Sequence, residues 1–128
     1  MLLHSLTRSG AITVSVALSG LMLLLCAMPE PVFHRLALWA TDDTSFAPWQ
    51  IVSAHLVHFT FFHAAMNIAG LLLTTHLLLN HLSVRVMASA TLCLMLFVGG
   101  GMLLISSPYA PYAGFSGVLH GLLVMGFV

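Results

Sequence analysis

Charged residues are scarce in this chain of 128 residues. Arg, Lys, Asp and Glu together make up 5% of the sequence, lysine is absent, and the formal net charge is zero. A soluble domain carries about a quarter charged residues, so the sequence excludes a cytosolic enzyme with a water-facing surface. The lack of a basic surface excludes a nucleic-acid partner. Because 60% of the residues are apolar, an intrinsically disordered segment is excluded as well.

Cysteine is also scarce, with Cys26 and Cys93 alone in the chain. Both lie inside apolar runs, so we expect each to be a small buried hydrophobic residue and not half of a disulfide. The mean hydropathy of +1.09 leaves an integral membrane protein as the remaining class.

Four apolar stretches predict an all-α fold, a polytopic membrane helix bundle. A spanning helix needs about 20 mostly apolar residues, and the predicted spans are residues 11–28, 61–79, 86–105 and 115–128. A cleaved signal peptide is an alternative for the first stretch, but its length and the lack of a clear cleavage site favour a retained span. The fourth is too short for a full crossing. We therefore expect residues 1–128 to form one membrane domain that is incomplete at its C-terminus.

The few charges predict the orientation. Arg8 precedes the first span and Arg85 lies between the second and third. All three acidic residues lie in the link 29–60, at Glu30, Asp42 and Asp43. The positive-inside rule then places the N-terminus in the cytoplasm and the link outside. This link is rich in apolar residues and contains Trp39 and Trp49, so we expect a partly helical segment lying at the outer membrane interface.

Three polar side chains are predicted at a shallow depth below the outer surface. His63 and Asn67 share a helix face at i, i+4 spacing, and Ser116 begins the fourth span. Polar groups at membrane depth are costly, and each is a functional candidate. The alternative is structural, because Ser often bonds its own backbone and Asn often links helices. Gly114 and Gly117 flank Ser116 and permit a tight turn and close approach, as around the nucleophile of some hydrolases.

The combined pattern resembles that of the rhomboid intramembrane serine proteases. It consists of His55, His58, His63 and Asn67, then two spans, then Gly114-Phe115-Ser116-Gly117. More narrowly, Trp49-Gln50, the His55/His58 pair and the run from Gly114 to Gly121 resemble rhombosortase, the rhomboid-like group of Gram-negative bacteria. The resemblance covers nearly the whole chain and matches the first four of six rhomboid helices.

The resemblance implies a role for each site residue. Ser116 matches the nucleophile, and His63 and Asn67 match the pair that forms the oxyanion hole with the Ser116 backbone N–H. Each such donor stabilises the developing oxyanion by roughly 3–4 kcal/mol. The family's general base is a histidine on the sixth helix, which no residue here matches. His120, at i+4 from Ser116, is an alternative base, but we favour a supporting role because same-helix neighbours rarely give the geometry for proton transfer.

The implied function is that of an intramembrane serine endopeptidase with a Ser–His dyad, in the bacterial inner membrane with its site toward the periplasm. The rhombosortase resemblance implies a membrane-anchored protein substrate with a C-terminal Gly-Gly motif, an apolar helix and a basic tail. No cofactor or metal is expected, and we expect these residues alone to be inactive. One alternative is a non-catalytic rhomboid-like protein that binds transmembrane segments. A weaker alternative is a metal or haem protein using His55 and His58, which lack further ligands nearby.

Overall fold

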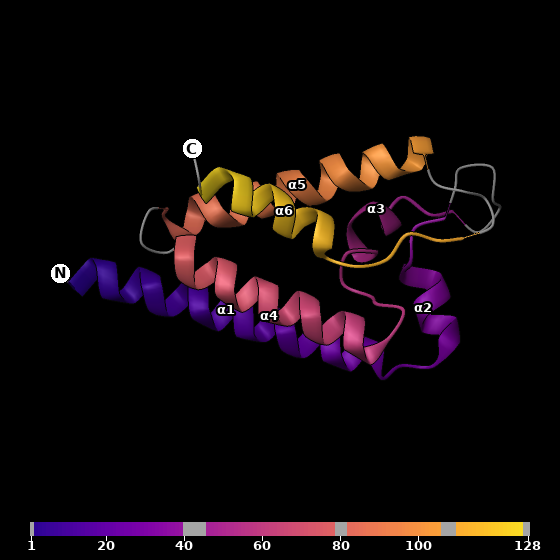
Figure 1. The fold of residues 1–128 in the computed structure, drawn as a ribbon, viewed down its shortest axis with the longest axis horizontal. Helices are drawn as coiled ribbons and strands as arrows, with labels where there is room; N and C mark the ends of the chain where they lie inside the picture. The colour runs from indigo at the N-terminus through magenta and orange to yellow at the C-terminus, as the bar shows by residue number, and fades with distance from the viewer. Residues whose placement is uncertain (1, 40–45, 79–81, 106–109, 127–128) are drawn as a thin grey trace.

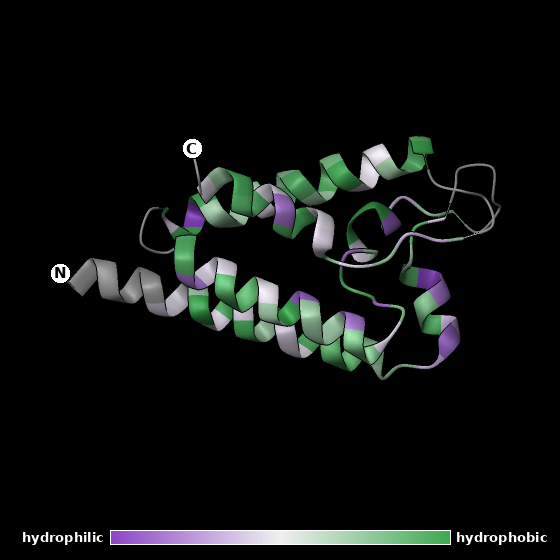
Figure 2. Ribbon diagram, in the orientation of Figure 1, coloured by the Kyte–Doolittle hydropathy of each residue, from purple (hydrophilic) through white to green (hydrophobic). Residues whose placement is uncertain are grey.

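The computed structural model describes residues 2–39, 46–78, 82–105 and 110–126 and confirms an all-helical membrane bundle (Figure 1). The helices in these residues are α1 (Leu2–Cys26), α2 (Glu30–Leu36), α3 (Gln50–Ser53), α4 (Phe61–Leu78), α5 (Val84–Ile105) and α6 (Ser116–Gly126). Three of them are long and apolar enough to cross a membrane: the Ser9–Cys26 part of α1, α4 and α5. Figure 2 shows hydrophobic colour along most of α1, α4, α5 and α6, while hydrophilic residues gather on α2 and at a few points elsewhere.

Local sequence signals explain where the long helices begin and end. Thr60 caps α4, since its Oγ1 accepts the His63 backbone N–H at 3.1 Å. Ser83 caps α5 in the same way, with its Oγ 3.3 Å from the Val86 nitrogen. Pro29 follows the end of α1, and the residue before a proline disfavours helical geometry. α1 starts at Leu2, well before the predicted span at residue 11.

α1 begins and α6 ends at the same end of the bundle (Figure 1). α1 and α4 lie side by side and run in opposite directions, and α6 packs between α4 and α5. The core between these helices is formed by buried apolar side chains that include Met22, Leu71, Phe115, Val118 and Leu122. Burial of Phe115 fixes the residue directly before the candidate nucleophile.

The link between α1 and α4 packs on the bundle. Ala37, Leu38 and Val57 are fully buried, and Leu38 exchanges both backbone hydrogen bonds with Tyr112 in an isolated antiparallel bridge. Part of the apolar character of this link therefore serves contacts within the protein, although Trp49 remains exposed as predicted for an interfacial residue. The two short helices bear out the partly helical prediction for the link.

The cysteines differ in part from expectation. Both are free thiols, as predicted, but Cys93 is exposed on α5 and Cys26 is only half-buried. In a membrane helix an apolar run faces lipid as readily as the core. An apolar neighbourhood in the sequence therefore does not imply burial inside the protein.

Candidate active site

Four of the predicted site residues line one cleft of about 280 Å³ between α4 and α6, called here the Ser116 cleft. Its walls are His63, Met66, Asn67, Gly70, Thr74, Ser116, Leu119, His120 and Leu123. The N-terminal part of α4 supplies His63 and Asn67 from adjacent turns of one face. The first turn of α6 supplies Ser116 and His120. Residues some fifty positions apart in the sequence are thereby brought to one hollow.

The His63 ring is held on three sides. It meets the His58 ring edge-on, with 5.0 Å between centroids, and stacks on the Phe59 ring at 6.2 Å. On the third side lies the backbone of Gly114, where an added Cβ would be 2.7 Å from Cε1 of His63. The imidazole therefore depends on Gly114 for the space that it occupies.

Asn67 is buried, and its side chain has one settled orientation. Its Nδ2 donates to the His63 carbonyl at 2.9 Å, one turn back on α4. Because a carbonyl only accepts, the nitrogen end of the amide is identified. An amide nitrogen carries two hydrogens, so the second Nδ2 hydrogen of Asn67 is left for another acceptor. Its Oδ1 is buried without a partner among the described residues.

Ser116 occupies the first position of α6, and its side chain is exposed. Gly114, two residues earlier, has φ = 122°, a conformation that L side chains rarely adopt. The Gly114 N–H donates to the Ala54 carbonyl at 2.9 Å, which ties this turn to the link before α4. The helix thus begins immediately after a sharp, anchored turn, and the serine is presented at the helix N-terminus.

His120 faces the Ser116 backbone. Its Nδ1 lies 2.7 Å from the Ser116 carbonyl oxygen, so Nδ1 is the protonated nitrogen that donates. The contact is therefore to the main chain of Ser116. Among the described residues, none hydrogen-bonds the Ser116 hydroxyl.

The comparison with protein families decides the membership of the chain. The family model of the Rhomboid domain matches residues 45–128, about two thirds of the sequence. This chain belongs to the rhomboid family. The matched residues include both walls of the Ser116 cleft, and the family is one of intramembrane proteases. The searches of curated proteins and of solved structures gave no significant match.

A buried cluster of polar contacts behind the cleft, called here the node, connects three parts of the rhomboid domain: the link before α4, helix α5 and the loop before α6. The His55 ring is fully buried, with Nε2 2.9 Å from the Met95 carbonyl of α5 and Nδ1 3.3 Å from the Gly114 carbonyl. A neutral imidazole carries one N–H, and the shorter contact assigns it to Nε2, which donates to Met95. The Gly114 carbonyl accepts from the Tyr112 hydroxyl at 3.1 Å. Burial lowers the pKa of His55 and raises the pKa of Tyr112, so both are neutral near pH 7.

His58 sits between this node and the cleft. Its ring is only 4% exposed, and neither ring nitrogen has a hydrogen-bond partner in the described part of the chain. Burial, with a smaller effect of His63, lowers the pKa of His58 from 6.5 to about 4. His55 and His58 are thus directed to different surroundings, one to backbone carbonyls and the other to the His63 ring.

Several residues around the cleft escaped the sequence analysis. Tyr112 was not singled out, because a tyrosine in a short polar loop is typical of an interface anchor. Its bond to Gly114 depends on the pairing with Leu38, which has no local signature. Gly70 could have been found from its position one turn after Asn67, where it faces Leu119 of α6.

Proposed function

We propose that this rhomboid domain is the core of an intramembrane serine endopeptidase in which Ser116 is the nucleophile. The observation that carries the proposal is the meeting of Ser116, His63 and Asn67 in one cleft. An exposed hydroxyl there faces donors of the kind that stabilise an oxyanion. Ser116 Oγ would attack a peptide carbonyl and pass its proton to a base, and the C–N bond would break as the protonated amine leaves. Water would then hydrolyse the acyl-enzyme ester, which releases the carboxylate product and restores the Ser116 hydroxyl.

The oxyanion hole is proposed to combine the Ser116 backbone N–H, the free Nδ2 hydrogen of Asn67 and a ring N–H of His63. The Ser116 N–H belongs to the first turn of α6, where backbone donors have no partner within the helix. The helix N-terminus adds favourable electrostatics for a developing negative charge. These donors are held in place before the reaction, as a preorganised oxyanion hole requires.

The general base is the part of the dyad that the cleft does not supply. His120 uses Nδ1–H to bind the Ser116 carbonyl, so we assign it a supporting role. We propose that the base is a histidine outside residues 1–128. Accordingly, residues 1–128 by themselves should not cleave a substrate.

The substrate and location follow from the resemblance to rhombosortase. We propose a membrane-anchored protein with a C-terminal Gly-Gly motif, an apolar helix and a basic tail, cut near the periplasmic face of a bacterial inner membrane. The arrangement of α1, α4 and α5 supports the orientation, since the N-terminus and Arg85 lie at one end of the bundle and Glu30 at the other (Figure 1). The end with Arg8 and Arg85 carries two of the three arginines, while Arg35 shares α2 with Glu30 at the other end. The positive-inside rule therefore places the end with Arg8 and Arg85 in the cytoplasm.

The test uses any longer protein that contains these residues, produced with a reporter carrying the Gly-Gly, helix and basic-tail signal. Ser116→Ala should abolish cleavage without reducing the amount of protein in the membrane. Ser89→Ala, an exposed serine on α5, is the matched control and should leave cleavage unchanged. Cleavage is measured as release of the reporter, seen as a size shift on a gel.

Three outcomes would contradict the proposal or one of its parts. Cleavage that survives Ser116→Ala would remove the nucleophile from the mechanism. Retention of the reporter by both forms without any cleavage would favour a non-catalytic rhomboid-like protein that binds transmembrane segments. Cleavage by residues 1–128 alone, lost in His120→Ala, would reassign the base to His120.

A further inference from the structure

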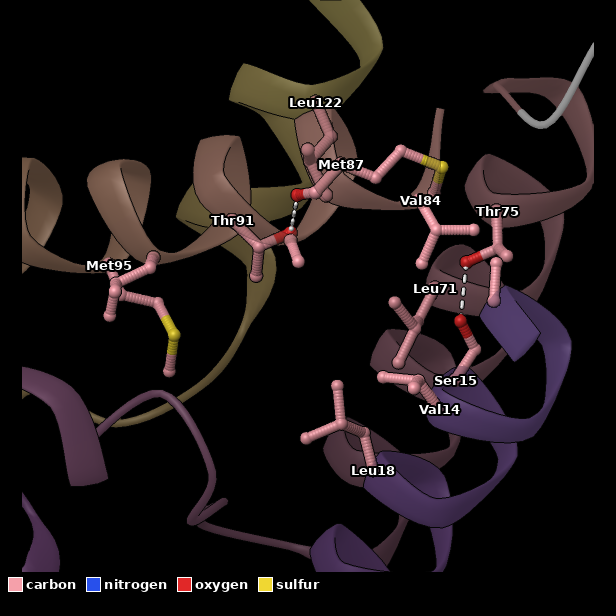
Figure 3. A pocket seen from close by; sticks show the side chains of 13 residues that line it. Val14, Ser15, Leu18, Leu71, Thr75, Val84, Met87, Thr91, Met95 and Leu122 are labelled. Atoms are coloured by element: carbon pink, nitrogen blue, oxygen red, sulfur yellow. Dashed lines mark hydrogen bonds between the residues drawn. The ribbon is translucent and has the colours of Figure 1, made fainter. Parts of the chain in front are cut away.

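A second cavity, of about 250 Å³, lies between α1, α4 and α5 on the other side of α6 from the Ser116 cleft. It is lined by Ala11, Val14, Ser15, Leu18, Leu71, Thr75, Val84, Met87, Ala88, Thr91, Leu92, Met95 and Leu122. These residues belong to the half of the bundle that carries the N-terminus and the start of α5. Figure 3 shows their side chains around an open central space. We call it the inner cavity.

The polar side chains in the walls of the inner cavity are three hydroxyl groups, and each takes part in a hydrogen bond. Ser15 and Thr75 hydrogen-bond each other at 2.7 Å, and the Thr91 hydroxyl donates to the Met87 carbonyl at 2.8 Å (Figure 3). The remaining lining side chains are aliphatic or methionine. A water molecule needs two to four polar partners, whereas apolar cavities of about 150 Å³ bind small hydrophobic molecules. The inner cavity is therefore suited to a hydrocarbon ligand.

The cavity is half-open, and its rim is exposed at membrane depth. Val14 on α1 and Leu92 on α5 line it and are each about half exposed, at 52% and 51%. Both helices are apolar enough to span a membrane, so this opening faces lipid tails. An acyl chain can enter from the bilayer without crossing water, which makes lipid the ligand with direct access.

The positive charge of arginines near the inner cavity favours a lipid with an anionic headgroup. Arg85 directly follows the lining residue Val84 and is exposed at the start of α5. Arg8 lies one turn before the lining residue Ala11 in α1. Glu30, the acidic residue in the described part of the chain, is at the opposite end of the bundle. Basic residues at a membrane surface attract anionic headgroups, so the positive end of the bundle complements a lipid phosphate.

We propose that the inner cavity binds one acyl chain of an anionic phospholipid whose phosphate lies beside Arg85. The acyl chain would fill the space between α1 and α5, and the end of the acyl chain would contact α4 and α6. Such a lipid binds the folded state alone and so stabilises the bundle. This site is separate from the Ser116 cleft and does not depend on the proposed protease activity.

The test measures lipid retained by the purified 128-residue chain in detergent, using native mass spectrometry. Phosphatidylglycerol and phosphatidylcholine with identical acyl chains are added in equal amounts. The wild-type chain should retain one phosphatidylglycerol in preference to phosphatidylcholine. Arg85→Gln should reduce this preference about fivefold, the effect of one arginine near a membrane surface.

Variants that fill the inner cavity test whether the acyl chain of the lipid binds there. Ala88→Phe places a ring in the inner cavity and should remove the retained lipid. The matched control is Ala17→Phe, at another exposed alanine that lies on α1 outside the cavity, and this variant should retain the lipid. If Ala88→Phe does not fold, the smaller substitution Ala88→Leu replaces it in the test and should lower the amount of retained lipid. Equal retention by the Ala88 and Ala17 variants, or equal binding of both lipids by the wild type, would overturn the proposal.

Discussion

At the scale of single residues, Gly114 meets two demands that no other residue satisfies together. Its φ of 122° is unfavourable for any residue with a Cβ, and the space where that atom would lie is taken by the His63 ring. The turn before the candidate nucleophile and the position of a proposed oxyanion donor therefore both depend on the absence of a side chain at Gly114.

Gly114→Ala should lower the free energy of unfolding by about 2 kcal/mol, because the backbone is strained and His63 must move. Gly100→Ala is the control, since a Cβ at Gly100 meets nothing within 4 Å in helix α5. It should be neutral or slightly stabilising because alanine favours helix more than glycine does. Thermal unfolding in detergent measures both, and equal effects would contradict this account of Gly114.

His58→Phe should stabilise the protein. The imidazole is buried, and its approach to the Leu56 backbone does not reach hydrogen-bond geometry at either ring nitrogen. An apolar ring of similar size therefore removes a cost of desolvation without losing a well-formed hydrogen bond. We expect the free energy of unfolding to rise by about 1–2 kcal/mol at pH 7. A loss of stability would show that the ring nitrogens have partners in the membrane-embedded protein.

The same residue should make stability depend on pH. The pKa of His58 is about 4 in the folded protein and 6.5 in the unfolded chain, so the unfolded chain takes up its proton first as the pH falls. Stability should therefore decrease from about pH 6.5 to about pH 4 and level off below, by up to about 3 kcal/mol. In His58→Phe this part of the pH dependence should disappear when unfolding is followed across that range.

The residues of the candidate site could be predicted from the sequence, but the contacts around them could not. The i, i+4 spacing of His63 and Asn67 and the glycines around Ser116 were enough to single out one face and one turn. Packing of the His63 ring on Gly114 was not predictable, because it depends on how the start of α4 meets the loop before α6. Such contacts between distant segments leave no periodic signal.

At the scale of elements, the packing of α6 on α5 depends on two glycines one turn apart. A Cβ on Gly121 would collide with the Leu94 side chain, and one on Gly117 would lie 2.9 Å from Cγ1 of Val98. Small residues at this spacing let membrane helices approach closely. The backbone of α6, with Ser116 at its start, is thereby held against a long helix.

Gly121→Leu should push α6 away from α5 and lower the unfolding free energy by about 1–3 kcal/mol, the usual cost of overpacking. Gly20→Leu is the matched control, because a Cβ at Gly20 meets nothing within 4 Å on α1. Thermal unfolding of the two variants in detergent should differ clearly. If both variants unfold at the same temperature, close approach of α5 and α6 is not required.

Helix positions were predicted well where a local signal marks the end. The predicted spans 61–79 and 86–105 correspond to α4 and α5, which begin after the capping residues Thr60 and Ser83. α1 begins before the predicted span 11–28, at Leu2, because hydropathy marks the membrane part of a helix and not its whole length. The short helices α2 and α3 lie in a link whose apolar residues follow no single period.

At the scale of the whole molecule, the link before α4 and the loop before α6 form one layer over the site end of the bundle. Leu38 and Tyr112 pair through both backbone hydrogen bonds, at 3.0 and 2.8 Å. Nearby, Ala54 accepts the Gly114 N–H and His55 approaches the Gly114 carbonyl. The turn that carries the candidate nucleophile is thus fixed to residues that precede it by about half the chain.

A disulfide tests this pairing in the membrane. Hydrogen-bonded antiparallel pairs have Cα atoms about 5.5 Å apart, within the range of disulfides. With Cys26 and Cys93 replaced by alanine, Leu38→Cys plus Tyr112→Cys should form a crosslink under mild oxidation. Leu38→Cys plus Ala88→Cys, at opposite ends of the bundle, should not. A gel shift reversed by reductant measures both, and a crosslink in the second pair alone would contradict the fold.

The Leu38–Tyr112 bridge also sets an order of assembly. Residue 38 leaves the ribosome before α4 and α5 are made, and its partner follows only after both helices. N-terminal parts of a chain begin to fold first during synthesis, but the turn before Ser116 has to wait for this late pairing. Under the proposed function, Ser116 would therefore become reactive only after this pairing has formed. While the nascent chain passes through the insertion machinery, its serine is not yet held in the geometry needed for attack.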